Sequence, residues 1–126
     1  MNSIIQWNMT SYQSNFEELK IIIQEMNYPA CLCLQETRQG DRLLRPPAGY
    51  KIIQSQQRRE DESERGVCML INKKIHHEEL PLRLSGNVEA VAAKLWLGRY
   101  HTVCSLYLSP SQVIQETDIT NLIDLF

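Results

Sequence analysis

The sequence predicts an α/β fold in which a mixed sheet has one β-α-β crossover and continues into antiparallel hairpins. Two short apolar segments, 4–9 and 30–35, flank a segment with helical periodicity, and this order is typical of a crossover between parallel strands. Later apolar segments are separated by turn residues or by a short link that contains glycine, as in hairpins. With 126 residues, the chain is expected to form one domain over 1–126.

The crossover begins with a strand at 4–9 and a helix that runs to about Met26. Ser14 and Glu17 have the spacing of a capping box. In that motif the serine hydroxyl accepts a hydrogen bond from the amide of Glu17, and the carboxylate accepts one from the amide of Ser14. Pro29 then prevents the helix from continuing. The apolar residues of the helix share one stripe: Phe16, Leu19, Ile22, Ile23 and Met26.

The second strand of the crossover, 30–35, is followed at once by Glu36. Parallel strands joined by such a crossover have their carboxyl ends at the same edge of the sheet, so Asn8 and Glu36 are expected side by side. Ligand sites of open α/β sheets gather at this edge. A carboxylate there can face a crevice instead of the core.

Four further strands are predicted at 50–55, 66–72, 88–97 and 100–108, and the last two are joined at Gly98-Arg99. Segment 58–65 carries seven charges of mixed sign, which predicts a solvated hairpin loop. A loop that contacts DNA is the alternative. Near the end of the chain, an apolar stripe predicts a helix that starts at Thr117 or Asp118: Ile119, Leu122, Ile123 and Phe126.

Composition narrows the class of protein. Thirteen basic and fifteen acidic residues give a net charge of −2, which argues against a polycation that binds nucleic acid by bulk charge but leaves a local phosphate site open. No apolar run approaches the roughly 20 residues of a membrane span, so no membrane partner is expected. The cysteines all lie in apolar runs and are interpreted as core thiols, ahead of a metal site or disulfides, which suits a reducing nuclear or cytoplasmic location. They are Cys31, Cys33, Cys68 and Cys104.

Three polar residues at predicted strand ends could carry chemistry: Asn8 in "IIQWN", Glu36 in "LCLQET" and Tyr107 in "VCSLYLSPS". Each has an ordinary alternative. An asparagine at a strand end commonly forms a turn, and a glutamate there is commonly a solvated charge. A tyrosine in a strand commonly packs its ring and exposes its hydroxyl.

The ordered set, with a helix between the first two residues and antiparallel strands before the third, resembles the endonuclease/exonuclease/phosphatase family, which includes DNase I-like enzymes. The segments "SIIQWNMTSYQSNFEELKIIIQEMNYPACLCLQET" and "HTVCSLYLSPS" are similar to the N-terminal endonuclease domain of jockey-type non-LTR retrotransposon polyproteins. The resemblance covers essentially the whole chain. It implies the N-terminal half of a DNase I-like αββα sandwich and cleavage of DNA phosphodiesters with Mg²⁺ or Mn²⁺.

The resemblance also implies roles for individual residues. Glu36 corresponds to the family's metal-binding glutamate, and Asn8 to the asparagine that orders the metal and the catalytic carboxylate. Tyr107 corresponds to the tyrosine that contacts the phosphate. Arg38 is a candidate contact to the DNA backbone, with a solvated surface arginine as the alternative. The implied partners are the phosphate backbone of DNA and the remainder of the retrotransposon polyprotein.

The sequence also departs from the family. No glycine follows Asn8 in "MTSYQSN", and the later motifs that bring the water-orienting aspartate and the histidine are absent. His76, His77 and His101 are not expected to replace that histidine, since adjacent residues of a strand face opposite ways. We therefore expect little or no nuclease activity from this chain alone. Uncovered sheet surface should also favour self-association.

Two other functions remain open at this stage. The same fold could act on a lipid or inositol phosphate headgroup. Alternatively, the chain is a non-catalytic remnant or an interaction module in which Asn8, Glu36 and Tyr107 are only polar residues at strand ends.

Overall fold

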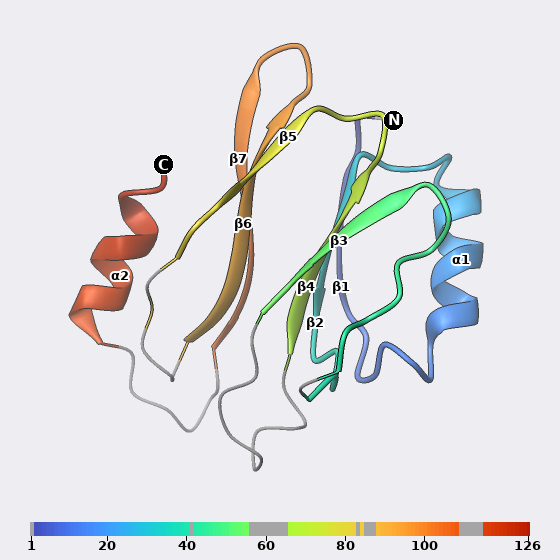
Figure 1. The fold of residues 1–126 in the computed structure, drawn as a ribbon, viewed down its shortest axis with the longest axis horizontal. Coiled ribbons are helices and arrows are strands. Elements are labelled where there is room, and N and C mark those ends of the chain that lie inside the picture. The colour runs from blue at the N-terminus through green and yellow to red at the C-terminus, as the bar shows by residue number, and fades with distance from the viewer. Residues whose placement is uncertain (1, 41, 56–65, 83, 85–87, 109–114) are drawn as a thin grey trace.

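The computed structural model describes residues 2–40, 42–55, 66–82, 84, 88–108 and 115–126 (Figure 1). This part of the chain forms a mixed α/β structure that consists mostly of strands. Seven strands make two sheets, and two helices lie outside them. The α/β class is thereby confirmed at this level.

The first sheet has the strand order β1-β2-β4-β3. Its strands are β1 (Ile4–Asn8), β2 (Cys31–Gln35), β4 (Val67–Asn72) and β3 (Tyr50–Gln54). β1 and β2 are parallel and joined by α1 (Phe16–Glu25), whereas the β2-β4 and β4-β3 pairs are antiparallel. The predicted β-α-β crossover is confirmed.

The second sheet is antiparallel, in the order β5-β6-β7. It contains β5 (His77–Leu80), β6 (Val88–Trp96) and β7 (Tyr100–Leu108), and α2 (Glu116–Ile123) lies on its side away from the first sheet (Figure 1). The β6-β7 hairpin agrees with the predicted one. β5 was not predicted, because "HEEL" is short and half acidic and lacks the apolar alternation of a strand.

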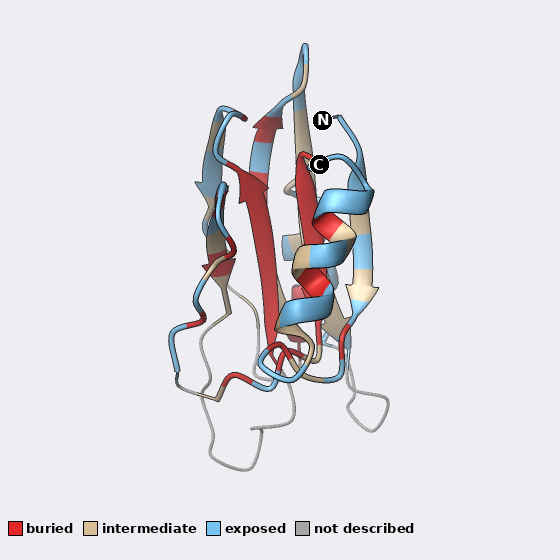
Figure 2. Cartoon of the chain, turned by 90° about the vertical axis from the view of Figure 1, so that its right-hand side faces the viewer, coloured by how far each residue is buried: buried red, intermediate tan, exposed pale blue. Residues whose placement is uncertain are grey.

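The core is split into two layers by the first sheet. On one side, Leu32, Leu34 and Leu70 pack against α1 through Leu19 and Ile23. On the other side, a second cluster joins the two sheets and includes Cys33, Val67, Met69, Val91 and Leu95. β4 is covered on both faces, so every one of its residues is buried (Figure 2). This explains why its sequence, "VCMLIN", does not alternate.

The cysteines are free thiols, as the sequence predicts. Cys31, Cys33 and Cys68 are buried and Cys104 is half-buried. Burial raises the pKa of the Cys68 thiol, and it raises the pKa of Cys104 to about 11, so both thiols are neutral at neutral pH. Neither described helix is long and apolar enough to cross a membrane.

The predicted capping box at Ser14 and Glu17 is wrong. The N-cap residue is Asn15, which makes no side-chain capping bond, and its side-chain amide instead donates to the carbonyl of Met9 over 2.6 Å. Ser14 lies in the turn before the helix. Its backbone amide and its hydroxyl both bond to the hydroxyl of Ser11. Ser14 therefore makes contacts within this turn and does not cap the helix.

The charged segment at 58–65 lies outside the described residues, so its two interpretations stay predictions. The helix near the chain end begins at Glu116, one or two residues before the predicted start at Thr117 or Asp118, after the N-cap residue Gln115. Its apolar residues Ile119 and Ile123 are largely exposed.

We expect Leu70→Ala to lower the free energy of unfolding by about 3 kcal/mol. Leu70 is fully buried on β4, and its truncation would leave a cavity under α1 that the flanking strands cannot close. Urea denaturation followed by circular dichroism measures the change.

Ile21→Ala is the matched control, because Ile21 lies on the exposed side of α1 with 54% of its surface accessible. Its effect should stay within about 0.5 kcal/mol. Equal losses for the two variants would contradict the assignment of this core layer.

Candidate functional site

Asn8 and Glu36 lie at the carboxyl ends of neighbouring strands. Asn8 is paired in register with Gln35, the residue that precedes Glu36, and the amide of Met9 donates to the carbonyl of Gln35 over 3.0 Å. Asn8 is exposed and Glu36 is partly exposed. The structure thus brings these two predicted residues to the same edge of the first sheet.

Gln35 connects this edge to the second sheet. Its side-chain amide donates to the hydroxyl of Ser105 on β7 over 3.0 Å, and that hydroxyl donates to the carbonyl of Leu34 over 3.3 Å. The side-chain amide of Gln6 donates to the oxygen of the Gln35 side chain. Gln35 is 6% exposed and Ser105 is 1% exposed. A polar chain, buried at Gln35 and Ser105, therefore ties β1, β2 and β7 together just before Asn8 and Glu36.

Tyr107 follows Ser105 by two residues on β7, so the two residues lie on the same face of that strand. Its partly buried ring packs against the cluster between the sheets. β7 runs from its hairpin toward the edge that holds the ends of β1 and β2 (Figure 1). Asn8, Glu36 and Tyr107 are therefore gathered at one end of the two sheets.

A second carboxylate lies opposite Tyr107. Glu89 on β6 is the register partner of Tyr107 and is only partly exposed. Its Oε2 accepts a hydrogen bond from the hydroxyl of Ser55 over 3.2 Å. The same hydroxyl accepts from the amide of Val67 over 3.0 Å. Glu89 is thereby attached to the ends of β3 and β4 as well as to β6.

The backbone turns sharply at Glu36. Glu36 has φ +53° and Arg38 has φ +54°, in the left-handed region that non-glycine residues rarely adopt. Between them, the amide of Thr37 donates to the carbonyl of Gly66 over 3.2 Å, and the carbonyl of Thr37 accepts from the amide of Tyr12 over 3.0 Å. These bonds hold the backbone in its positive-φ conformation. Because the chain turns here, the regular alternation of side chains along β2 ends at Gln35.

Buried side chains also hold the turn at Glu36 in place. The Thr37 hydroxyl donates to the side-chain oxygen of Gln39, and the amide of Gln39 donates to the carbonyl of Ser55 over 2.7 Å. Thr37 and Gln39 are each 1% exposed. Arg38, which lies between these two residues in the sequence, is exposed and is accessible to a phosphate or to solvent.

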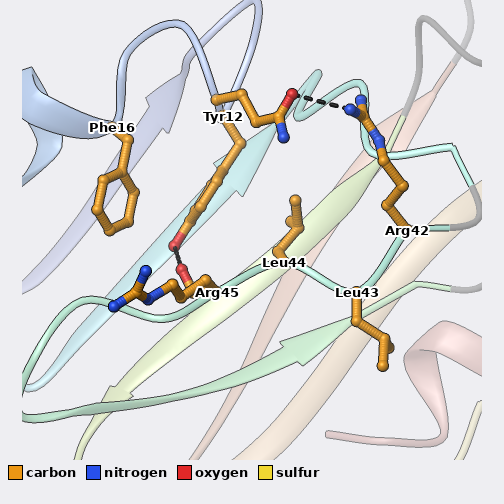
Figure 3. A pocket seen from close by; sticks show the side chains of 7 residues that line it. Tyr12, Phe16, Arg42, Leu43, Leu44 and Arg45 are labelled. Carbon is orange, nitrogen blue, oxygen red and sulfur yellow. Dashed lines mark hydrogen bonds between the residues drawn. The ribbon is translucent and has the colours of Figure 1, made fainter.

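Arg42 fixes the next part of this loop and borders a hollow of about 300 Å³ beside α1 (Figure 3). Its guanidinium donates to the carbonyls of Arg38 and Gln39 and, over 2.8 Å, to the side-chain oxygen of Gln13. Across the hollow, the hydroxyl of Tyr12 donates to the carbonyl of Arg45 over 2.7 Å. Arg42 thus connects the hollow to the turn that carries Glu36 and Arg38.

The three histidines lie away from this edge. His77 opens β5 and is paired with Leu95, near the turn of the β6-β7 hairpin, and His76 precedes it. His101 is also paired with Leu95, from β7, and lies at the beginning of that strand. Since β7 reaches the Glu36 edge at its other end, none of these residues can join the candidate site.

The oxygen ligands at this edge suit a cation that binds few protein groups and keeps water as its other ligands. Among the described residues, no group of three or more His, Cys, Asp or Glu side chains could hold a metal ion. Mg²⁺, however, keeps several waters and commonly uses one or two carboxylates together with substrate phosphate. Glu36 can supply such a carboxylate, and the amide oxygen of Asn8 is a second hard donor at the neighbouring strand end.

Sequence reasoning missed Gln35, Ser105 and Glu89. The signal was present in each case, because each is a polar residue at a position that alternation assigns to a buried face. The partner of each residue comes from a distant strand, however, and the sequence does not specify that pairing. Gln35 and Ser105 are 70 residues apart.

A scan against protein-family models finds no matching family, and a search of curated proteins finds no significant match. The family suggested by the sequence motifs is therefore carried forward as a proposal.

We expect Gly66→Ala to destabilise the protein more than Gly98→Ala. Both glycines have positive φ, at +121° and +86°, so a side chain strains either backbone by about 1 kcal/mol or more. Only at Gly66 would the added methyl group collide with Thr37 and Gln39, whereas nothing lies within 4 Å at Gly98.

Chemical denaturation of both variants measures the difference. A loss for Gly98→Ala as large as that for Gly66→Ala would contradict the close packing of the Thr37 turn against Gly66.

Proposed function

We propose that the edge formed by Asn8, Glu36 and Tyr107 is part of the active site of a metal-dependent DNA endonuclease of the endonuclease/exonuclease/phosphatase family, of the kind found in non-LTR retrotransposons. The observation that carries the proposal is the chain of hydrogen bonds through Gln35. It joins the ends of β1, β2 and β7, the three strands whose ends hold the residues named by the motifs.

The layer order also supports the DNase I-like part of the proposal. α1, the first sheet, the second sheet and α2 follow one another across the molecule (Figure 1). This is the order expected for the N-terminal half of an αββα sandwich. The cluster between the sheets contains side chains from β2, β3, β4 and β6, so the two sheets share one core layer.

Each residue has a role that its chemistry permits. The carboxylate of Glu36 provides the anionic oxygen that a hard cation prefers. The amide of Asn8 can donate to a phosphate, or donate to or accept from a water, next to that carboxylate. The hydroxyl of Tyr107 can donate to a phosphate oxygen as negative charge develops on it. Arg38 is exposed on the same turn and can contact the next phosphate through its planar fork of donors.

A bound Mg²⁺ or Mn²⁺ would supply charge neutralisation at the scissile phosphate and its leaving oxygen. The chain's own contribution is to hold the phosphate by Tyr107 and Arg38 and to fix the turn at Glu36. The aspartate that orients water and the histidine of the family have no counterpart in this sequence at the expected motifs. The proposal therefore assigns the metal-binding and phosphate-binding part of a nuclease site.

We expect Mn²⁺ to bind at this edge and to broaden the amide NMR signals of Asn8, Glu36 and Tyr107 before those of other residues. Glu36→Gln should abolish the selective broadening, because the substitution removes the anionic ligand and keeps the shape of the side chain. Titration of ¹⁵N-labelled protein with Mn²⁺ measures the effect.

Two controls sharpen this experiment. Glu18→Gln changes an exposed carboxylate on α1 and should leave the pattern unchanged. A short DNA duplex should tighten Mn²⁺ binding, since phosphate completes the coordination, whereas an inositol phosphate that did so more strongly would favour the headgroup alternative. Broadening that survives in Glu36→Gln, or that centres elsewhere, would refute the proposed metal site.

A further inference from the structure

The end of the sheets opposite to the candidate site carries exposed aromatic and basic side chains. We define this surface as the aromatic-basic strip, and it lies at the β6-β7 hairpin and at the turn before β5 (Figure 1). None of its members was used in the proposed function. The strip consists of Lys73, Lys74, His76, Lys94, Trp96 and Tyr100.

Two large aromatic rings form the centre of the strip. Trp96 and Tyr100 are register partners where β6 passes into β7, and their ring centroids lie 4.9 Å apart in an edge-to-face arrangement. Trp96 remains 47% exposed and Tyr100 52% exposed. The contact between the rings therefore leaves about half of the surface of each residue open to a ligand.

A lysine side chain and a histidine ring lie beside this pair. The Nζ atom of Lys94 lies 6.0 Å from the ring centroid of Tyr100, and the ring of His76 lies 6.5 Å from it. The amide of Trp96 donates to the carbonyl of His76 over 2.9 Å, so the hairpin and the turn before β5 are held together. Glu78 lies opposite Lys94 in the register, but these two described residues form no ion pair.

The strip continues into a hollow of about 420 Å³. Lys73 and Lys74 line this hollow together with Tyr28, which is itself 45% exposed. Lys74 lies two residues before His76, whose ring lies beside that of Tyr100, so the turn before β5 links the hollow to the aromatic pair. Exposed rings and lysines thus occur together at this end of the sheets.

From this arrangement we infer that the aromatic-basic strip binds single-stranded nucleic acid. Unpaired bases stack on exposed aromatic rings, and the phosphates between them are neutralised by neighbouring lysines. Bases in a duplex cannot reach the rings in this way. An anionic membrane would also attract lysines and aromatic rings, so binding to vesicles is the competing outcome of the test below. The inference does not depend on the proposed nuclease, because the strip and Glu36 lie at opposite ends of the sheets.

Fluorescence anisotropy with a labelled oligo(dT) of about 15 nucleotides, in EDTA, tests the inference. We expect Trp96→Ala and Tyr100→Ala each to weaken binding at least about fivefold, and Trp96→Phe to retain most of it because phenylalanine still offers a ring face. Lys74→Gln should lower the slope of affinity against salt concentration by about 0.7.

Two further measurements separate this binding from other effects. Lys20→Gln changes a lysine on α1, which covers the opposite side of the first sheet, and should leave affinity unchanged. Lys74→Gln does not touch the hairpin, so it tests the strip even if an aromatic variant folds poorly.

A folded wild-type protein that fails to bind oligo(dT) would overturn the inference. So would binding that is insensitive to both Trp96→Ala and Lys74→Gln, equal affinity for duplex DNA, or preferential binding to vesicles of phosphatidylcholine and phosphatidylserine.

Discussion

The hydrogen bond between Gln35 and Ser105 is the contact on which the candidate site depends. An amide buried between two sheets must find polar partners, because an unsatisfied buried group costs about 1–3 kcal/mol. Gln35 finds them in Ser105 from the second sheet and Gln6 from the neighbouring strand. The apolar contacts between the sheets are non-directional, whereas this bond fixes the register in which the ends of β1, β2 and β7 meet.

The ends of the two sheets differ in their physical character. At the Glu36 end, buried amides and hydroxyls hold a backbone with positive φ, an arrangement that maintains a fixed geometry at some cost in strain. At the hairpin end, large rings and lysines are exposed and contact one another at the surface. The first kind of surface suits a site that must position a phosphate closely, and the second suits a site that accepts bases of any sequence.

The sequence predicted the elements that have their own periodicity or turn chemistry. The β1-α1-β2 crossover and the β6-β7 hairpin follow from local patterns, and so does the common edge for Asn8 and Glu36. It did not predict β5, whose four residues owe their conformation to pairing with β6. It misplaced the helix cap, because Ser14 bonds to Ser11. The roles of Gln35 and Glu89 depend on partners from distant strands, and no local pattern specifies those.

A double-mutant cycle on Gln35 and Ser105 tests the central claim most directly. Gln35→Leu and Ser105→Ala should each destabilise the protein, and the two changes together should cost less than their sum, because removing both partners leaves neither unsatisfied. We predict a coupling of about 1 kcal/mol in the free energy of unfolding. Additive losses, within about 0.3 kcal/mol, would contradict the view that this bond joins the two sheets at the candidate site.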